Sequence, residues 1–496
     1  MSSSEQSVVS KVLKGGSWLY LSNILNNIFG FVYWFVISII GGPSVLGYTS
    51  AVIGLASIII GLLNMGSGIG LQKYIGEAWG QKDRESLSTY FWSTTLFSAI
   101  VYFAAGFMLM LLALSGFSYK EFSPQAFVIC SLLVALGFNT NFTALFTAVL
   151  KTNIVALVSA LGNVVRLAVG ITLVIWGWSW VGASLGYVFH YLVMLLVYLY
   201  LSRLYSEKRI AFSLSAVYKI LKAGSVSWLP NVVTLLGQWL GVLVVFGSTG
   251  AVETGAYYIA FTISSVVVGL GLNITMLLLP VLSSLTDGRK RVCWSTLKVC
   301  YALILPLAFA LMTYPWAPLK LLRGEYVSAS SSLFVLLASS AFIIFVGAVT
   351  NLLYAYNGYM KILALGAALN IPRIVLYFIL VPPYGGYGAA LSFLAGSITG
   401  FLASVIIAKN IGFTPSYKTI ACLAAVPLAL SSVAWTILRQ EWIIGVPLII
   451  ILSYIMYIKL NLISKNEVKL IVYALTPSLI LNKVKPLLEI TARILF

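Results

Sequence analysis

Long apolar stretches separated by short polar segments follow one another along nearly the whole chain. A run of about 20 apolar residues is long enough to cross a hydrocarbon core of about 30 Å as a helix, and fourteen such candidates can be counted. The runs do not alternate between apolar and polar residues, as membrane β-strands would. We therefore expect an all-α polytopic membrane protein with about 14 transmembrane helices. The predicted spans are 17–40, 45–71, 89–114, 125–149, 153–176, 179–201, 224–247, 254–281, 294–316, 329–355, 362–381, 386–408, 419–438 and 442–460.

The order of spans, glycines and loop charges repeats halfway along the chain. A constant shift of 208 positions aligns the first spans of the two halves, and the shift later shrinks by one or two residues. An even number of spans per repeat returns the chain to the same side of the membrane, so parallel repeats are related by an axis along the membrane normal. The matched pairs include Gly42 with Gly250, Gly47 with Gly255, Asn23 with Asn231, Lys82 with Lys290, and Arg166 with Arg373.

This duplication predicts the domain organisation. We expect two parallel six-helix lobes, at 1–205 and 206–410, related by pseudo-twofold symmetry and facing each other. Two additional transmembrane helices in 411–460 fall outside the repeat. The segment 461–496 is basic and half apolar, and we expect it to form a cytoplasmic or interfacial tail.

The composition and the distribution of charge agree with a membrane location. Of the 496 residues, 60% are hydrophobic and 8% are charged, whereas soluble domains are about 25% charged. The net charge of +18 could indicate nucleic-acid binding, but the positive-inside rule explains it better. With a cytoplasmic N-terminus, nearly all lysines and arginines outside the spans face the cytoplasm. We therefore expect a multi-pass protein of the cell membrane with both termini cytoplasmic and no nucleic-acid partner. The basic residues expected outside are Lys120, Lys320, Arg323 and Arg439.

Two arginines lie deep inside predicted spans. Arg166 follows Asn163 by three residues, and Arg373 follows Asn370 by the same spacing. A cation at the centre of a spanning helix costs at least about 2.5 kcal/mol, so it marks a functional interior position with a partner. The planar guanidinium suits the oxygens of a diphosphate and does not lose its charge. We expect these four residues to contact one anionic ligand, although arginines that only join helices by donating to backbone carbonyls remain the alternative.

Three further polar residues in spans are candidates for the same site. Asn23 and Asn231 recur at matched positions of the first and seventh spans, where amides either join helices or line a wet cavity. His190, in the sixth span, is the only histidine of the chain. It is either a core histidine or a proton relay, since its ordinary pKa lies near neutrality.

Several chemistries are disfavoured by residues that the sequence lacks. All twelve acidic residues fall in loops, in termini or at span edges, so no carboxylate is placed to bind a coupling cation inside the membrane. No GxxxxGK[ST] phosphate loop occurs. We expect no catalytic residue, no metal and no cofactor, and therefore a secondary transporter rather than an enzyme.

Three segments resemble a known family. They are Gly41-Gly-Pro with Leu46-Gly-Tyr, then the stretch from Asn64 to Tyr74, Asn-Met-Gly-Ser-Gly-Ile-Gly-Leu-Gln-Lys-Tyr, and finally Gly80-Gln-Lys-Asp83. In these patterns the chain is similar to Wzx-like polysaccharide-biosynthesis flippases of the multidrug/oligosaccharidyl-lipid/polysaccharide exporter superfamily, the MOP superfamily, which also contains MATE transporters. The resemblance covers essentially the whole chain. It departs from the lipid II flippase branch, which carries charged residues in its first span.

The resemblance implies a V-shaped pair of lobes around a cationic cavity. Such a protein flips a polyprenyl- or dolichyl-(di)phosphate-linked oligosaccharide from the cytoplasmic to the outer leaflet by alternating access, for polysaccharide or glycoprotein glycan assembly. The expected partners are this lipid-linked oligosaccharide and membrane lipids, with a monomeric transporter working beside glycan-assembly enzymes. Two alternatives stay open: a MATE-type antiporter of drug or metabolite cations, and a membrane-embedded glycosyltransferase. The missing buried and outer-loop acids count against both.

Overall fold

The computed structural model describes residues 3–205, 212–276, 282 and 287–464. Within these residues the chain is helical, apart from turns and an isolated bridge between Tyr119 and Phe122. It divides into two compact units, Met1–Tyr258 and Ile259–Phe496. The expectation for the tail beyond residue 464 lies outside the described residues.

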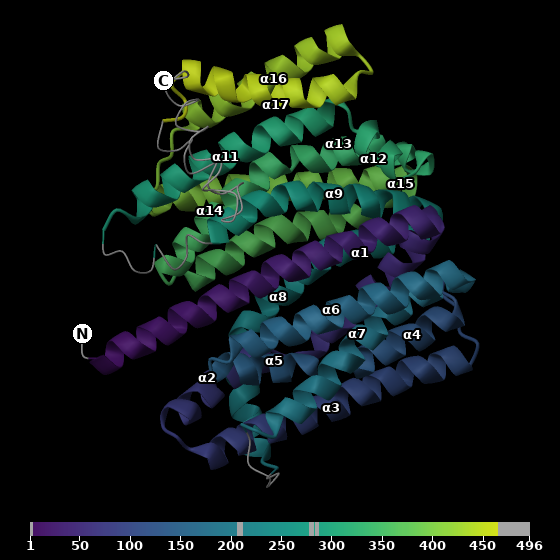
Figure 1. Cartoon of the computed structure of the whole chain (residues 1–496), viewed down its shortest axis with the longest axis vertical. Coiled ribbons are helices and arrows are strands. Elements are labelled where there is room, and N and C mark those ends of the chain that lie inside the picture. The colour runs from purple at the N-terminus through teal and green to yellow at the C-terminus, as the bar shows by residue number, and fades with distance from the viewer. Residues whose placement is uncertain (1–2, 206–211, 277–281, 283–286, 465–496) are drawn as a thin grey trace. The chain divides into compact units, whose positions relative to one another are not determined.

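The first unit is built from the early helices of the chain, and α9 runs from it into the second. Within it α6 lies beside α7 and α3 beside α4 (Figure 1). Asp83 caps the start of α3 by accepting a hydrogen bond from the Ser86 amide at 2.9 Å. Hydrogen bonds from the side chain and the backbone of Ser86 lower the pKa of the Asp83 carboxyl. The elements are α1 Ser3–Leu63, α2 Ser67–Gly80, α3 Arg84–Leu114, α4 Pro124–Ala135, α5 Asn139–Ala148, α6 Thr152–Leu173, the π-helical turn η1 Val174–Trp178, α7 Ser179–Ser202, α8 Leu214–Thr249 and α9 Ala251–Met276.

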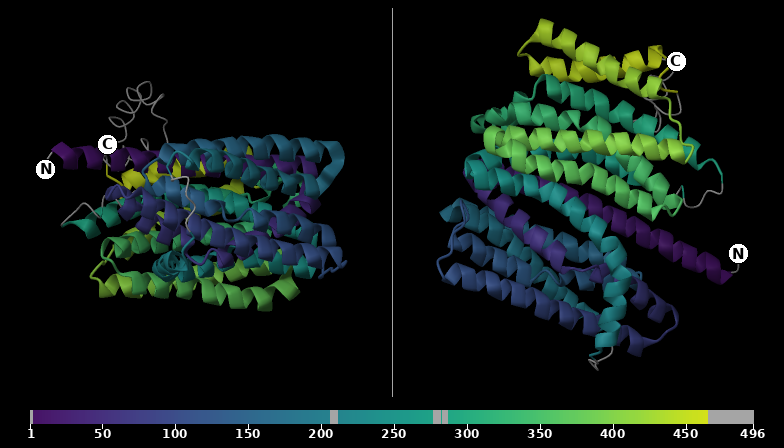
Figure 2. Two further views of the ribbon diagram at one scale, coloured as in Figure 1. Left: turned by 90° about the horizontal axis from the view of Figure 1, so that it is seen from below. Right: turned by 180° about the vertical axis from the view of Figure 1, so that it is seen from behind.

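The second unit contains the later helices. The two C-terminal helices, α16 and α17, form a pair that packs on α11 (Figures 1 and 2). The remaining elements are α11 Arg289–Thr313, α12 Trp316–Leu322, the 3-10 turn η2 Gly324–Ala329, α13 Ser330–Ala338, α14 Ser340–Ala355, α15 Tyr359–Asn410, α16 Tyr417–Leu438 and α17 Trp442–Lys459.

Eleven helical segments of the described chain are long and apolar enough to cross a membrane. Three of them, Leu25–Leu63, Thr152–Ser202 and Tyr359–Asn410, are 39, 51 and 52 residues long. Each is interrupted by a glycine of positive φ, at Gly42, Gly177 and Gly385 respectively, and each covers two of the fourteen predicted spans. The predicted all-α polytopic membrane fold is confirmed.

Two predicted spans are broken in ways that the sequence pattern did not show. The span predicted to run to residue 71 ends with α1 at Leu63, because Met65 and Gly66 adopt φ values of 47° and 79° before α2 begins. The span 125–149 is two helices, α4 and α5, separated at residues 136–138. Apolar residues continue through both interruptions, so hydropathy alone does not reveal them.

The two repeats share their unusual backbone conformations. Gly42 has φ 73° and ψ −175°, and its partner in the repeat, Gly250, has φ 84° and ψ −175°. Ser179 has φ 52° and ψ −138°, against φ 53° and ψ −134° at Gly385. Positive φ is easily adopted by glycine but is strained for serine. The internal duplication therefore extends from sequence to backbone geometry.

Close packing attaches α8 to the first compact unit. A Cβ on Gly66 would lie 2.3 Å from the carbonyl carbon of Gly224, and a Cβ on Gly61 would lie 2.2 Å from a methyl of Leu235. Only glycine lets helices approach so closely. The repeat assigns α8 to the lobe 206–410, whereas the compact unit extends to Tyr258; the lobe boundaries remain a prediction from the sequence repeat.

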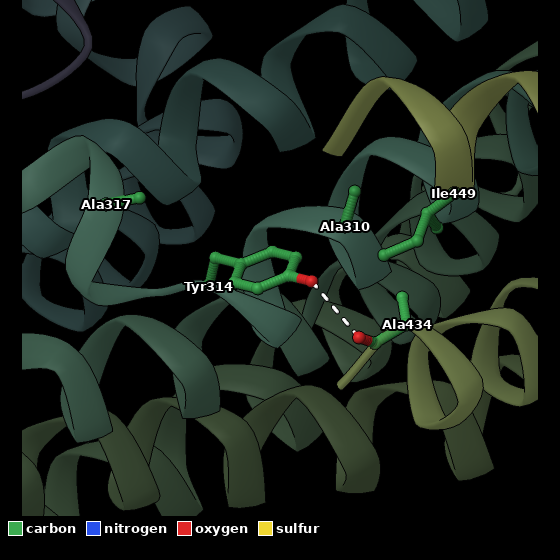
Figure 3. Packing of buried hydrophobic residues seen from close by; sticks show 5 residues of the cluster. All are labelled: Ala310, Tyr314, Ala317, Ala434 and Ile449. Atoms are coloured by element: carbon green, nitrogen blue, oxygen red, sulfur yellow. Dashed lines mark hydrogen bonds between the residues drawn. The ribbon is translucent and has the colours of Figure 1, made fainter. Parts of the chain in front are cut away.

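The two helices beyond the duplication pack on α11 through one tyrosine. The Tyr314 side chain is fully buried, and its hydroxyl donates to the Ala434 carbonyl oxygen at 3.4 Å (Figure 3). Gly445 of α17 leaves space for this ring, because a Cβ there would lie 2.3 Å from the tyrosine oxygen. Ala310 and Ile449 complete the contact. The pair α16–α17 is thus fixed to the unit by a specific buried cluster.

Candidate functional site

Arg166 lies in α6 between two aromatic rings from other helices. Its guanidinium carbon is 5.0 Å from the ring centre of Tyr33 in α1 and 4.8 Å from that of Tyr187 in α7. The Arg166 residue is 6% exposed. The faces of such rings attract a cation, and the attraction is stronger away from water. This arrangement holds a permanent positive charge in the interior of the first unit, and we call Arg166, Tyr33 and Tyr187 the first arginine site.

One edge of this guanidinium has no hydrogen-bond partner. The Nε and Nη2 atoms of Arg166 are buried and donate to no acceptor among the described residues. These two nitrogens form one edge of the guanidinium plane, the edge that binds two oxygens of a carboxylate or phosphate side by side. A buried charged donor without an acceptor is costly. The site is therefore suited to receive an anionic ligand at this edge.

Hydrogen bonds fix the helices that surround the first arginine site. Asn163 of α6 donates through Nδ2 to Asn26 Oδ1 of α1 at 2.5 Å. The Tyr33 hydroxyl donates to the Ala183 carbonyl oxygen of α7. Three helices are thereby joined around the arginine, because one bond links α1 to α6 and the other links α1 to α7.

Arg373 of α15 is held differently. It donates through Nη1 to Asn370 Oδ1 at 3.4 Å and through Nη2 to the Ser397 hydroxyl at 3.2 Å. Its guanidinium carbon lies 3.8 Å from the ring centre of Phe393, and the residue is 3% exposed. We call Arg373, Asn370, Phe393 and Ser397 the second arginine site. Its neutral acceptors stabilise the charge within the second unit itself.

The predicted pairs of asparagine and arginine therefore act in two ways. At the second site Asn370 contacts its arginine directly, as the three-residue spacing on a helix predicts. At the first site Asn163 instead contacts Asn26. Whether any of these residues binds a ligand stays a prediction.

His190 lies in the packing beside Arg166 rather than in a described cavity. A Cβ on Gly162 of α6 would be 2.8 Å from the histidine Nδ1, so the two helices meet closely here. The histidine ring also contacts Tyr191 edge-on, with ring centres 5.2 Å apart. The imidazole thus packs between α6 and α7, and its part in ligand binding or proton transfer stays a prediction.

Asn231 lines a separate cavity of the first unit. The cavity has a volume of about 410 Å³ and lies between α1, α2, α5 and α8. Asn231 is an exposed residue of α8. Its repeat partner Asn23 lies in α1, and the side chain of Asn23 is outside the described part of the structure.

The aromatic residues of both arginine sites were missed by the sequence analysis. Tyr33 lies seven residues after Asn26, on the same face of α1. Tyr187 and Phe393 occupy matched positions of the two repeats, at the smaller shift that also aligns Gly182 with Gly388. A search for aromatic residues at matched positions in the spans next to the arginines could have found them.

Comparisons with known proteins agree with this fold. A family model described as polysaccharide biosynthesis protein matches residues 12–286. No match was found among curated proteins.

Solved structures of transporters are similar over most of the chain. The lipid II flippase MurJ in an inward closed conformation is 15% identical, with a TM-score of 0.74 over 89% of this chain and 99% of MurJ. A multidrug resistance MATE family transporter of the MOP superfamily, in an inward-facing conformation, is 17% identical, with a TM-score of 0.55 over 80% of this chain and 95% of the other. A MOP superfamily transporter from Pyrococcus furiosus is 16% identical, with a TM-score of 0.52 over 83% of this chain and 96% of its own.

The family match covers more than half of the chain, and the structural matches extend the shared fold to nearly all of it. Fold similarity at such low identity does not transfer a substrate. The chain belongs to the polysaccharide biosynthesis protein family and has the multi-pass helical fold of the MOP superfamily.

Proposed function

We propose that this protein flips a polyprenyl- or dolichyl-(di)phosphate-linked oligosaccharide from the cytoplasmic to the outer leaflet by alternating access. Membership of a polysaccharide biosynthesis family supports a glycan as cargo. The observation that carries the proposal is the buried edge of Arg166, whose Nε and Nη2 have no acceptor among the described residues. A phosphate of the lipid linkage supplies two oxygens in the geometry that this edge requires.

The first arginine site accounts for selectivity toward an acidic lipid carrier. The rings of Tyr33 and Tyr187 stabilise the guanidinium charge of Arg166 while no ligand is bound. Neither ring supplies a hydrogen-bond acceptor to Nε or Nη2, so this edge stays available to a ligand. A phosphate can therefore bind without first displacing a carboxylate.

Access to the buried edge requires movement of helices. In the present conformation Arg166 is 6% exposed, so α1, α6 and α7 must separate before a phosphate reaches Nε and Nη2. The two hydrogen bonds that join α1 to α6 and α1 to α7, Asn163 to Asn26 and Tyr33 to Ala183, are neutral. Each contributes only about 0.5–1.5 kcal/mol, so they add little to the packing contacts that opening must break.

The charge distribution and the family support a proposed cellular setting. We place the protein in the cell membrane with both termini in the cytoplasm, as the positive-inside rule predicts. It acts as a monomeric secondary transporter rather than an enzyme, beside the enzymes that assemble and polymerise the glycan. Supply of the loaded carrier on one side and its removal on the other give the direction of net movement.

Depletion of the protein tests the proposal in cells. We expect a lipid-linked oligosaccharide to accumulate in the cytoplasmic leaflet, measured by its protection from an impermeant enzyme that removes glycans in intact cells. A complementing plasmid with the wild-type chain should restore exposure of the glycan. Normal glycolipid exposure together with new sensitivity to organic cations would contradict the proposal and indicate a MATE-type antiporter.

A further inference from the structure

A cavity of the first unit, distinct from both arginine sites, carries polar side chains but no charge. Fourteen residues line its volume of about 410 Å³, which is within the range of about 300–1,000 Å³ typical of ligand pockets. None of the fourteen is a lysine, arginine, histidine or acid. The polar lining consists of three amides and two hydroxyls, from Asn64, Gln72, Asn231, Thr140 and Thr143. We call this space the amide cavity.

The backbone around the amide cavity keeps it open. On one side α1 and α8 are in close contact, since a Cβ on Gly54 would lie 2.7 Å from the ring of Trp239. On the other side the turn at Gly66 touches Gly224 of α8. Gly68 of α2 faces open space, because a Cβ built there would have no atom within 4 Å. The helices are thus held together on both sides of a space that no described side chain fills.

One side chain of the amide cavity is aromatic and fixed in orientation. Trp228 of α8 donates its Nε1–H to the Gly61 carbonyl oxygen at 3.0 Å. The indole has only this one donor, so what it presents to the cavity is the apolar ring. A large, rigid aromatic surface beside hydrogen-bonding groups is suited to a ligand with both apolar and polar faces.

The amides supply the polar half of the lining. Asn64 donates through Nδ2 to Thr140 Oγ1 at 3.2 Å, which holds the end of α1 against α5. The side chains of Gln72 and Asn231 have no hydrogen-bond partner among the described residues. Each amide offers two donors and an acceptor oxygen. Their uncommitted groups can bind a ligand that both donates and accepts hydrogen bonds.

These features favour one chemical class. A phosphate needs cationic donors, which this lining lacks. A lipid tail would bury the amides of Gln72 and Asn231 without hydrogen-bond partners, which is unfavourable. A sugar ring matches both halves, because its C–H face can lie on an indole while its hydroxyls exchange hydrogen bonds with amides.

We propose that the amide cavity binds an uncharged sugar residue of the transported glycan, separately from the phosphate at Arg166. This inference rests on the proposed function and specifies part of its substrate. The cavity lies toward the end of α1 that precedes the basic segment at Lys73 and Lys82. The charge distribution predicts that this segment is cytoplasmic. The cavity therefore meets the glycan on the cytoplasmic side, where the glycan is loaded. It selects for neutral over acidic sugars, since none of its fourteen described lining residues is a cation that can pair with a carboxylate.

Filling the cavity provides the main test. Gly68→Leu places a side chain into the open space. Gly76→Leu is the matched control, because Gly76 lies on the same helix and does not line the cavity. A Cβ built on Gly76 would also have no atom within 4 Å. Binding to the purified full chain is measured by saturation-transfer NMR with the methyl glycosides of glucose and N-acetylglucosamine. We expect at least one neutral glycoside to bind, Gly68→Leu to weaken it at least about tenfold and Gly76→Leu to leave it unchanged.

Substitutions of the tryptophan test the proposed contact itself. Trp228→Phe keeps a ring and should retain binding within about threefold, whereas Trp228→Leu should lose about tenfold, or about 1.4 kcal/mol. Gln72→Ala and Asn231→Ala change exposed side chains and serve if Trp228→Leu does not fold; each should weaken binding about threefold to tenfold. Methyl glucuronide and inorganic diphosphate should not compete.

The outcomes separate this inference from the proposed function. Equal sugar binding by Gly68→Leu and wild type, no binding of any neutral glycoside, or displacement of the sugar by a short alkyl phosphate would overturn the sugar assignment. The same variants are also assayed for movement of a lipid-linked oligosaccharide in vesicles. Normal movement by Gly68→Leu removes only the amide cavity from the account, whereas no movement by the wild type removes the flippase proposal itself.

Discussion

The two arginine sites occupy matched positions of the duplication but differ in what satisfies the charge. Arg166 has two rings beside it and a guanidinium edge without an acceptor among the described residues. Arg373 has one ring and donates to both Asn370 and Ser397. The matched arginines therefore differ in their hydrogen bonds, and we propose that Arg166 serves a ligand and Arg373 mainly the fold.

The helix packing beside the arginines has also diverged. In the first repeat His190 of α7 meets Gly162 of α6. In the second, Gly396 meets the chain at Leu369, where a Cβ would lie 2.4 Å from the leucine carbonyl oxygen. Gly162 corresponds to Leu369 in the repeat, and His190 corresponds to Gly396. The small residue thus lies on the arginine's helix in the first repeat and on the neighbouring segment in the second. Each repeat keeps close packing while presenting a different surface to its arginine. Size complementarity is retained across the pair of positions rather than at either one.

The largest expected effect concerns the first arginine site. Arg166→Gln should reduce the flipping of a lipid-linked oligosaccharide about tenfold to hundredfold, because a charge-assisted hydrogen bond contributes about 1.5–3 kcal/mol. Arg166→Lys keeps the charge and should lose less. Rates are measured in vesicles and normalised to folded protein. Normal rates for the glutamine variant, or failure only through loss of the protein, would refute ligand binding at this edge.

The matched substitution in the second repeat should act on stability. Arg373→Gln removes the N–H groups that donate to Asn370 and Ser397. Each of these buried acceptors then lacks its arginine donor, at a cost of about 1–3 kcal/mol. We expect a lower melting temperature and less folded protein than for Arg166→Gln, with a smaller loss of flipping per folded molecule. If Arg373→Gln is as stable as wild type but does not flip the lipid-linked oligosaccharide, then Arg373 does not act mainly on stability and the proposed difference between the two sites is wrong.

Removing the aromatic rings should change the stability of the two arginine sites by different amounts. The guanidinium of Arg373 lies closer to its ring than that of Arg166, at 3.8 Å against 4.8 Å for Tyr187. A desolvated cation–π contact contributes up to about 2 kcal/mol. Phe393→Leu should therefore lower the melting temperature more than Tyr187→Leu. Tyr187→Phe keeps the ring and is the control, so it should lose less than Tyr187→Leu. The reverse order of Phe393→Leu and Tyr187→Leu would show that ring distance does not govern the two sites.

The smallest effect is expected from the asparagine of the first repeat. Asn163→Ala breaks the bond to Asn26 and should cost about 1 kcal/mol. Asn26→Ala should cost a similar amount, and the double variant should cost little more than either, because both remove the same bond. Thermal unfolding of the three variants measures this. Additive losses would mean that the two amides act independently.

Much of the fold could be predicted from the sequence because membrane crossing has a simple physical signature. Length and hydropathy predicted the helical class and the spans, and the spacing of Gly42 and Gly250 indicated a duplication that the backbone angles share. The break after Leu63 could not be found this way, since it depends on the backbone conformations of Met65 and Gly66 inside an apolar stretch.

The sites were less predictable than the spans. Two buried arginines could be located from their cost in a membrane, but their partners depend on which helices pack together. Ser397 and Phe393 are 24 and 20 positions from Arg373 along the chain, and a serine or phenylalanine in an apolar span carries no signal of its own. The amide cavity likewise combines side chains from four helices, which no local pattern relates.

We propose that this protein recognises an acidic phosphate linkage, and transport of one glycan on two different lipid carriers tests this proposal. Vesicles containing the purified wild-type protein are loaded with one oligosaccharide on two carriers: a polyprenyl diphosphate and a neutral glycerolipid. Movement of each across the bilayer is followed by the glycan's accessibility to an impermeant lectin. We predict rapid protein-dependent movement of the diphosphate-linked glycan, and movement of the neutral-linked glycan at least about tenfold slower, as loss of a charge-assisted contact implies. Equal movement of both, or movement of neither, would contradict the account.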